Sequence, residues 1–354
     1  MKSMILGCLG VFSAVAFMFG CSYSALLGLV CTIIVFRFYK EKSAQVDPRN
    51  KAVFITGCDS GFGNQFARRL DEKGFTVFAG CLMPDREGAR LLKEESSDRL
   101  HVVHVDVTDE WLVRGAVKYV KENLGDNELW AIVNNAGIAI FTEIEWCSVV
   151  QFQRILDVNV IGVVRVTKAF LPLIRNSNGR IVNVASLAGR FTMPAFAAYS
   201  MSKRACIAFS DALRIEMKKF NVKVSTIEPS LYKTPISETK YLADQNRKSW
   251  SETPTEVKDA YGDEYFDAFL KNIDTQMQRA KSNISEVIDL MVESVLDEIP
   301  KVRYVPSSSI VRATILTFLP SYITDRLFQI YTPRVVPRQS TSSVSSASDN
   351  DVPS

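Results

Sequence analysis

Short β-rich runs alternate along this chain with longer segments in which apolar residues recur at helical spacing. The β-rich runs are nearly continuous in Val, Ile, Leu and Phe, which is typical of strands buried on both faces. Strands joined through helices return parallel to one another, and the helices cover both faces of the sheet. The pattern predicts an α/β fold with a doubly wound parallel sheet, whose strands lie at 51–57, 75–80, 100–107, 129–137, 179–186 and 222–229.

Composition limits the size and the partners of the protein. The 354 residues allow one large domain with additional segments, and a net charge of +3 without a dense basic run argues against a nucleic-acid partner. The 7 cysteines have neither metal-ligand nor CxxC spacing, so we expect buried or membrane-facing free thiols. His101 and His104 lie in one strand-like run, and the sequence offers no third ligand beside them, so no metal site is expected.

The amino-terminal residues have an unusual composition. Residues 4–36 contain no charged side chain, and a membrane-spanning helix needs only about 20 apolar residues. We therefore expect a membrane anchor at 1–36 and a polar linker at 37–50. A cleaved signal peptide, whose apolar region is normally shorter, is the alternative. The GCSYS stretch at 20–24 leaves open whether the anchor is one helix or two.

Charges beside the expected anchor predict its orientation. Arg37, Lys40 and Lys42 follow it and outweigh Lys2 and the amino terminus, and cytoplasmic flanks carry the excess of positive charge. We expect the main domain on the cytosolic side of the endoplasmic reticulum membrane, with a mitochondrial membrane as the alternative. An Asn-Ile-Ser sequon at 283–285 offers a check, because its glycosylation would report a lumenal domain.

The carboxyl-terminal part departs from the alternating pattern. Residues 230–285 are charged, aromatic and helical in spacing, and too long for a simple loop, so we expect a helical lid over the carboxyl end of the sheet. Residues 306–331 mix large apolar side chains with Arg312 and Arg326, which suits either an interfacial membrane helix or a helix packed on the core. The Ser-rich residues 332–354 have too little apolar content to fold and are expected to be disordered.

A glycine-rich turn, TGCDSGFG, follows the first predicted strand and opens a helix. Gly57, Gly61 and Gly63 allow a tight turn and let a pyrophosphate approach the free N–H groups of the helix N-terminus. At the end of the fourth strand, NNAG (134–137) has amides that can tie strand ends together and a glycine that leaves room for a ligand. Asp106, at the end of the third strand, can accept from an adenine amino group. The pattern predicts a dinucleotide site of the Rossmann type.

Tyr199 and Lys203 are four residues apart and therefore share a helix face. A phenol is a poor base at neutral pH, and an ammonium held beside it favours the phenolate by Coulomb attraction. Ser186, at a strand end, can hydrogen-bond the same substrate oxygen, and Asn159 can position a water that links Lys203 to solvent. A surface Tyr and Lys would explain the pair alone, but not all of these features in order on alternating strands and helices.

With TGxxxGxG, NNAG, Asn159, Ser186 and YxxxK in this order, the chain resembles the short-chain dehydrogenase/reductase family over about residues 51–305. Through KAVFITGCDSGFG, GFTVFAGCL, AFSDALRIEM and AYGDEYF it is similar to the branch of retinol, 17β-hydroxysteroid and D-β-hydroxybutyrate dehydrogenases. The resemblance implies a Rossmann catalytic domain with a tetrad of Asn159, Ser186, Tyr199 and Lys203. The cofactor-binding residues that it implies are Thr56, Gly57, Asp59, Ser60, Gly61, Phe62, Gly63, Asp106, Val107, Asn135, Ala136, Gly137, Tyr199, Lys203, Pro229 and Thr234.

Further details follow from the same resemblance. It implies that Lys203 hydrogen-bonds the nicotinamide ribose and that Thr234 touches the carboxamide side. The family's Pro-Gly after the sixth strand is Pro229-Ser230 here, so a side chain is expected to crowd the nicotinamide edge. Family members often pair through their long helices, so the resemblance also allows a homodimer.

The residues near the expected adenosine ribose predict NAD rather than NADP. A 2′-phosphate needs a cation, whereas a free ribose diol needs an acceptor or nothing. The glycine-rich turn carries Asp59, and no Lys or Arg follows the second strand until Arg86. The Asp59 carboxylate would repel a 2′-phosphate, so NAD is expected. At the family level, the net direction is then oxidation of an alcohol, because cellular NAD is mostly oxidised.

The substrate pocket is expected to be lined by residues that follow Ser186 and Pro229, with mostly apolar walls. Such walls suit a bulky hydrophobic secondary or allylic alcohol, a steroid or a retinol, with Tyr199 as the general base. A membrane anchor suits the same substrates, which partition into lipid. The expected walls are Leu187, Phe191, Met193, Pro194, Phe196, Leu231, Tyr232 and Ile236, under a lid that contributes Trp250, Tyr261, Tyr265 and Phe266.

Two alternatives stay open at this point. A D-β-hydroxybutyrate dehydrogenase would need a buried cation for the substrate carboxylate, and Arg190 and Lys233 are the candidates. A catalytically idle scaffold that binds lipid is the other, although an idle homologue would have no need of a poised phenol.

Overall fold

The computed structural model describes residues 44–338 of the chain. The expected membrane anchor (1–36), residues 37–43 of the linker and residues 339–354 of the expected tail lie outside the described residues. Within residues 44–338, no helix combines the length and the apolar character that a membrane crossing requires.

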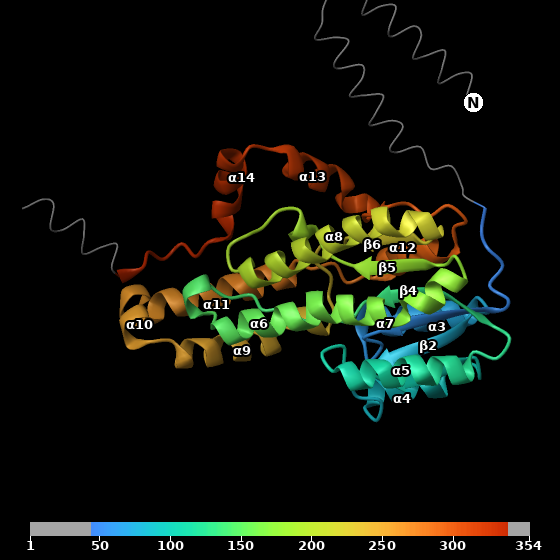
Figure 1. The fold of residues 1–354 in the computed structure, drawn as a ribbon. Helices are drawn as coiled ribbons and strands as arrows, with labels where there is room; N and C mark the ends of the chain where they lie inside the picture. Colours follow the sequence, from blue (N-terminus) through green and yellow to red (C-terminus); the bar gives the residue numbers. More distant parts are fainter. Residues whose placement is uncertain (1–43, 339–354) are drawn as a thin grey trace, which may run out of the picture. The chain divides into compact units, whose positions relative to one another are not determined.

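A seven-stranded parallel sheet runs through the centre of the described chain, in the order β3-β2-β1-β4-β5-β6-β7 (Figure 1). The predicted doubly wound sheet is therefore confirmed. The strand order reverses between β1 and β4, where the carboxyl ends of an open α/β sheet form a crevice for ligands. The strands are β1 (Lys51–Thr56), β2 (Thr76–Cys81), β3 (Leu100–His104), β4 (Glu128–Asn134), β5 (Arg180–Val184), β6 (Lys223–Ile227) and β7 (Arg303–Tyr304).

Helices cover both faces of this sheet because its strands are apolar on both sides. Val53 and Ile55 of β1 pack in one core with helices α3, α4 and α12, whereas Ala52 and Phe54 pack in a second core with α5, α7 and α8. The alternation follows from the twofold side-chain period of a strand. The helices that pack on the sheet are α3 (Gly61–Glu72), α4 (Glu87–Glu94), α5 (Glu110–Asn123), α7 (Val163–Asn176), α8 (Ala197–Met217) and α12 (Ser285–Leu296).

The helical connection between β4 and β5 is interrupted by a π-helical segment. A capping box of Ser148 and Gln151 starts α6 (Val149–Leu156), which continues through the π segment Asp157–Gly162 into α7. A Cβ on Gly162 would come 2.7 Å from a methyl group of Val107, so the glycine lets the π segment lie against the chain after β3. Segments of this kind occur frequently at functional sites, and this one contains Asn159.

Five further helices lie after β6. They are α9 (Thr239–Glu252), α10 (Thr255–Tyr261) and α11 (Asp263–Gln278), and then α13 (Ser307–Phe318) and α14 (Ser321–Phe328). An aromatic cluster joins α9 and α11, where Trp250 stacks on Phe266 with ring centroids 4.7 Å apart and meets Trp146 edge-on at 4.8 Å. These rings are buried away from water and fix the helices to the loop after β4.

The cysteines in the described part of the chain are buried free thiols, as predicted. They are Cys58, Cys81, Cys147 and Cys206. Burial raises the pKa of Cys81 to about 12 and that of Cys147 to about 11, so neither forms a reactive thiolate near neutral pH. No cluster of three or more potential metal ligands occurs within residues 44–338.

Candidate active site

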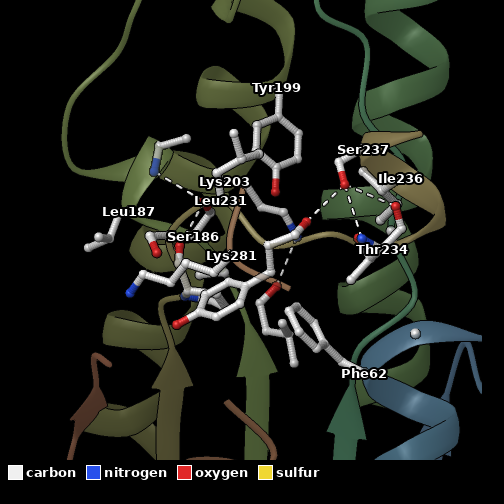
Figure 2. Close-up of a pocket in the computed structure, with 18 of the residues that line it drawn as sticks. Phe62, Ser186, Leu187, Tyr199, Lys203, Leu231, Thr234, Ile236, Ser237 and Lys281 are labelled. Atoms are coloured by element: carbon white, nitrogen blue, oxygen red, sulfur yellow. Dashed lines mark hydrogen bonds between the residues drawn. The ribbon is translucent and has the colours of Figure 1, made fainter. Parts of the chain in front are cut away.

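One cavity of about 530 Å³ extends from the glycine-rich turn to the loops after β5 and β6 (Figure 2). Its position at the carboxyl ends of β1, β4, β5 and β6 is the crevice that the strand order creates. The predicted cofactor-binding residues that line it are Gly57, Asp59, Ser60, Gly61, Phe62, Asn135, Ala136, Gly137, Tyr199, Lys203, Pro229 and Thr234. Ser186 lines the same cavity, so the structure brings the glycine turn together with Ser186, Tyr199 and Lys203.

The turn after β1 has a backbone that only glycines fit. Gly57 and Gly61 have φ values of +72° and +63°, in the left-handed region that favours glycine. A Cβ on Gly57 would lie 2.8 Å from Ala136 Cα, and a Cβ on Gly63 would lie 2.3 Å from the Gly57 carbonyl oxygen. Ser60, the N-cap residue of α3, makes no capping side-chain hydrogen bond within the described chain, which leaves the N–H groups of the first turn for an anion. The turn therefore fits a dinucleotide pyrophosphate.

Replacing Gly63 with alanine is expected to destabilise the fold by about 1–3 kcal/mol and to weaken dinucleotide binding, because the new methyl group overlaps the Gly57 carbonyl. Thermal unfolding and dinucleotide titration measure the two effects. Gly115→Ala is the matched control, since nothing lies within 4 Å of its added methyl in α5. That control is expected to keep or gain stability, by about 0.5–1 kcal/mol. Equal stability of both variants would contradict the close packing of the turn.

Side chains of β1 and β4 tie the floor of the cavity together. The Thr56 hydroxyl accepts from the backbone N–H groups of Asn135 and Ala136 at 3.1 and 3.0 Å. The Asn135 amide donates to the carbonyls of Thr56 and Gly57 at 2.9 and 3.0 Å. Thr56 and Gly63 do not line the cavity themselves, so their role is to hold the turn in place.

Tyr199 and Lys203 project from the first turns of α8 into this cavity (Figure 2). The Lys203 ammonium lies 5.7 Å from the centroid of the Tyr199 ring and donates to the Val184 carbonyl at 2.9 Å. Lys203 is buried, and Phe141 meets the Tyr199 ring edge-on at 5.4 Å. The ammonium is thus held close to the phenol by a hydrogen bond to the end of β5.

Ser186 lies across the cavity at the end of β5. Its hydroxyl donates to the Pro229 carbonyl at 3.3 Å and accepts from the Ala188 N–H at 3.1 Å. These contacts join the loop after β5 to the loop after β6, where the unexpected Ser230 also lines the cavity. The Ser186 hydroxyl is thus held by both loops where they line the cavity.

Asn159 lies behind the cavity rather than in its wall. It is fully buried on the π segment and exchanges two hydrogen bonds with the backbone of Ile138, each of 2.9 Å. Its amide also donates to the Ser202 hydroxyl at 3.0 Å, and Ser202 in turn donates to the Tyr199 carbonyl at 2.7 Å. A Cβ on Gly137 would lie 3.2 Å from Asn159 Oδ1 and 3.5 Å from Lys203 Nζ, so both side chains border the same glycine.

Three of the predicted cofactor residues contact neighbouring parts of the described chain. Asp106 accepts from the N–H and hydroxyl of Thr108 at 2.8 and 2.7 Å, and does not line the cavity. Val107 packs against the π segment. Asp59 lines the cavity, and its carboxylate accepts from the N–H groups of Leu82 and Met83 at 3.0 and 2.8 Å, at the end of β2.

The apolar wall of the cavity is only partly the predicted one. The lid residues Trp250, Tyr261, Tyr265 and Phe266 were wrongly predicted to line it, because they pack with one another and with Trp146 in the aromatic cluster. Pro194 is also absent from the wall. The predicted residues that do line the cavity are Leu187, Phe191, Met193, Phe196, Leu231, Tyr232 and Ile236.

Part of the wall comes from residues that the sequence did not indicate. They belong to the end of α11 and to the carboxyl-terminal segment, and the helical pattern of 306–331 did not reveal which face would turn inward. Phe328 of α14 stacks on Phe191, with ring centroids 5.7 Å apart and planes 20° apart, which holds this segment beside the cavity. These added residues are Gln276, Arg279, Lys281, Ser308, Ser309, Ala313 and Tyr331.

Arg190 and Lys233, the cations proposed to bind a substrate carboxylate, do not line this cavity. The Arg190 guanidinium donates to both oxygens of the Glu228 carboxylate, at 2.8 and 2.6 Å. Glu228 is buried and also accepts from Arg303 at 3.3 Å. Arg190 therefore fastens the loop after Ser186 to the end of β6 and is neutralised there.

The comparisons with known proteins agree with this fold. Residues 51–245 match the family model described as short chain dehydrogenase. The chain is 41% identical over 281 residues to 17-beta-hydroxysteroid dehydrogenase type 6 of Rattus norvegicus, covering 79% of this chain and 87% of that protein. It is 38% identical over 315 residues to retinol dehydrogenase 7 of Mus musculus, covering 89% of this chain and 98% of that protein.

A solved structure shares the fold. A short-chain dehydrogenase from Streptomyces avermitilis superposes with a TM-score of 0.59 at 21% identity, over 84% of this chain and 99% of its own. The chain therefore belongs to the short-chain dehydrogenase family and is an oxidoreductase. Within that family it falls in the branch of the 17β-hydroxysteroid and retinol dehydrogenases.

Proposed function

We propose that the protein is a membrane-anchored, NAD-dependent oxidoreductase that oxidises a hydrophobic secondary or allylic alcohol, a steroid or a retinol, to the carbonyl. The observation that carries the proposal is the single cavity in which a glycine turn, Ser186, Tyr199 and Lys203 meet an apolar wall. The similarity to steroid and retinol dehydrogenases supports the substrate class.

In this proposal Tyr199 is the general base. Its phenolate takes the hydroxyl proton of the alcohol, while the Ser186 hydroxyl turns its proton from the Pro229 carbonyl to the same oxygen and keeps that oxygen beside the phenol. The nearby Lys203 ammonium stabilises the phenolate electrostatically. A bound nicotinamide would accept the hydride that leaves the alcohol carbon. The residues that hold the dinucleotide are those of the glycine turn and of the Asn135–Gly137 stretch.

Asn159 completes the proposed path of the proton. Because Asn159 and Lys203 border the same glycine, Gly137, a water held between them would pass a proton from Lys203 toward solvent. The hydrogen bonds of Asn159 to Ile138 and Ser202 fix its amide for that task. The π segment supplies the geometry that turns Asn159 inward.

The preference for NAD rests on Asp59. Its carboxylate is fixed by the N–H groups of Leu82 and Met83 at the end of β2, where the adenosine ribose of a dinucleotide lies in folds of this type. A 2′-phosphate beside it would meet a negative charge. We expect a higher kcat/KM with NAD than with NADP. Asp59→Asn is expected to lower the ratio of these two kcat/KM values. An unchanged ratio in that variant would show that another residue discriminates between NAD and NADP.

A substrate panel tests the proposal. The purified full chain is assayed with NAD against a retinol, a 17β-hydroxysteroid and 3-hydroxybutyrate. Turnover of a retinol or of the steroid is expected, and turnover of 3-hydroxybutyrate alone would overturn the substrate class. The pairing of Arg190 with Glu228 removes one of the two cations on which the hydroxybutyrate alternative rested, whereas Arg279 and Lys281 line the cavity, so the panel includes 3-hydroxybutyrate.

The proposed location is the endoplasmic reticulum membrane with a cytosolic catalytic domain, and a mitochondrial membrane is the alternative. Asn283 is exposed, and its side chain accepts from the Ser285 N–H at 2.9 Å, so the sequon would be reachable by a lumenal transferase. We expect no change in mobility when the expressed protein is treated with an endoglycosidase. A shift that Asn283→Gln abolishes would reverse the orientation.

A further inference from the structure

The outer face of the carboxyl-terminal segment is an exposed row of large apolar side chains. In α13, Val311, Ile315 and Phe318 recur at the spacing of one helix face, and they are 55%, 55% and 78% exposed. The row continues beyond α13 with Tyr322 and Ile330, which are 70% and 74% exposed. Figure 1 draws α13 and α14 in red, outside the helices that cover the sheet.

The inner face of the same helix is buried and belongs to the cavity. Ala313 and Leu316 are nearly inaccessible, and Ala313 lines the cavity together with Ser309. A helix that is apolar on both faces needs a nonpolar environment on both sides. The rest of the described chain supplies that environment on the inner side of α13, whereas the outer side is exposed to solvent within residues 44–338.

The charges of this region are complementary to anionic lipid. Between residues 306 and 338 the sequence has the basic residues Arg312, Arg326, Arg334 and Arg338, against the single acidic residue Asp325. Aliphatic and aromatic side chains together with arginines are the composition of helices that lie in the interface of a bilayer. The uncharged residues 4–36 would keep the chain at such a surface.

We propose that the outer face of residues 307–330 docks on the surface of a lipid bilayer that contains anionic headgroups. Docking places α13 between the bilayer and the cavity, so a hydrophobic alcohol dissolved in the lipid enters beside this helix without crossing water. The route of entry rests on the proposed function, whereas the docking does not.

Hydrogen exchange tests the docking on the full chain. The protein is reconstituted in vesicles of phosphatidylcholine and phosphatidylserine, and amide exchange in residues 307–330 is compared with that in detergent micelles at matched protein concentration. We expect exchange to slow by about tenfold in the vesicles. The double variant Ile315→Asp, Phe318→Asp should lose that protection, and Ile215→Asp, an exposed apolar position on α8, should keep it.

The possible outcomes separate docking from catalysis. Equal exchange in vesicles and micelles would overturn the proposal, and so would protection that rises with protein concentration instead of lipid, which would indicate a second copy of the chain. Protection without turnover of any alcohol would leave docking intact and remove the proposed function. For entry, the double variant should raise KM for a retinol dissolved in the vesicles by several-fold and leave the constants for a water-soluble secondary alcohol unchanged.

Discussion

Replacing Tyr199 with phenylalanine is expected to lower kcat for alcohol oxidation by about 10²–10⁴-fold, the usual contribution of a general base. The substitution removes only the phenolic oxygen. The ring can keep its edge-on contact with Phe141, and Lys203 keeps its hydrogen bond to the Val184 carbonyl. Dinucleotide affinity and thermal stability should therefore remain close to those of the unmodified chain. Steady-state kinetics, dinucleotide titration and thermal unfolding measure the three quantities.

Tyr241→Phe is the matched control for this variant, because Tyr241 is exposed on α9 and outside the cavity. It should leave kcat unchanged. Full activity of Tyr199→Phe would show that another group takes the proton. A cellular effect of the protein that survives in Tyr199→Phe, in the absence of turnover, would favour the idle lipid-binding scaffold.

Replacing Lys203 with methionine is expected to reduce kcat by about 10²-fold or more and, unlike Tyr199→Phe, to weaken dinucleotide binding. Methionine keeps the length of the buried stem but removes both the charge near the Tyr199 ring and the donor to Val184. In the proposed function the lysine stabilises the phenolate and also binds the dinucleotide, so both kcat and dinucleotide affinity should change. Loss of the buried hydrogen bond is also expected to cost about 1–3 kcal/mol of stability.

The exposed Lys240 of α9 provides the control, since Lys240→Met removes an equal charge outside the cavity. It should leave both kcat and dinucleotide affinity unchanged. A Lys203→Met variant that binds the dinucleotide normally would limit the lysine to its effect on the phenol. A variant with unchanged kcat would contradict the electrostatic role of Lys203.

The sheet could be predicted from sequence because its physical signal is local. Strands such as Lys51–Thr56 and Arg180–Val184 are apolar on both faces, and only strands covered by helices on both sides tolerate that. The two-residue strand Arg303–Tyr304 is too short to show a period. The π segment was missed because its apolar spacing matches that of an ordinary helix, and its backbone depends on contacts of Asn159 that are distant in sequence.

The part of the cavity around the glycine turn, Ser186 and Tyr199 could be predicted from the sequence. The apolar part of its wall could be predicted only incompletely. The glycine turn and Ser186 follow strand ends that a parallel sheet brings to one edge, and Tyr199 stands in the first turn of α8, the helix that follows β5, so the topology gathers them. The aromatic residues of α9 and α11 were misplaced because sequence does not say whether an apolar ring turns toward a cavity or toward other rings. Trp250 and Phe266 stack on each other instead of lining the cavity. Residues of the segment from Ser308 to Tyr331 line the part of the wall that was predicted to come from those rings.

In the proposed function, catalysis and substrate selectivity are consequently encoded in separate stretches of this chain. The proposed catalytic side chains stand on α8 and beside β5, within the sheet's own framework, while the last helices and the turn after them contribute other residues of the cavity wall, namely Ser308, Ser309, Ala313 and Tyr331. Mutations among those last helices can therefore reshape which alcohols are accepted while the proton-transfer step is left untouched.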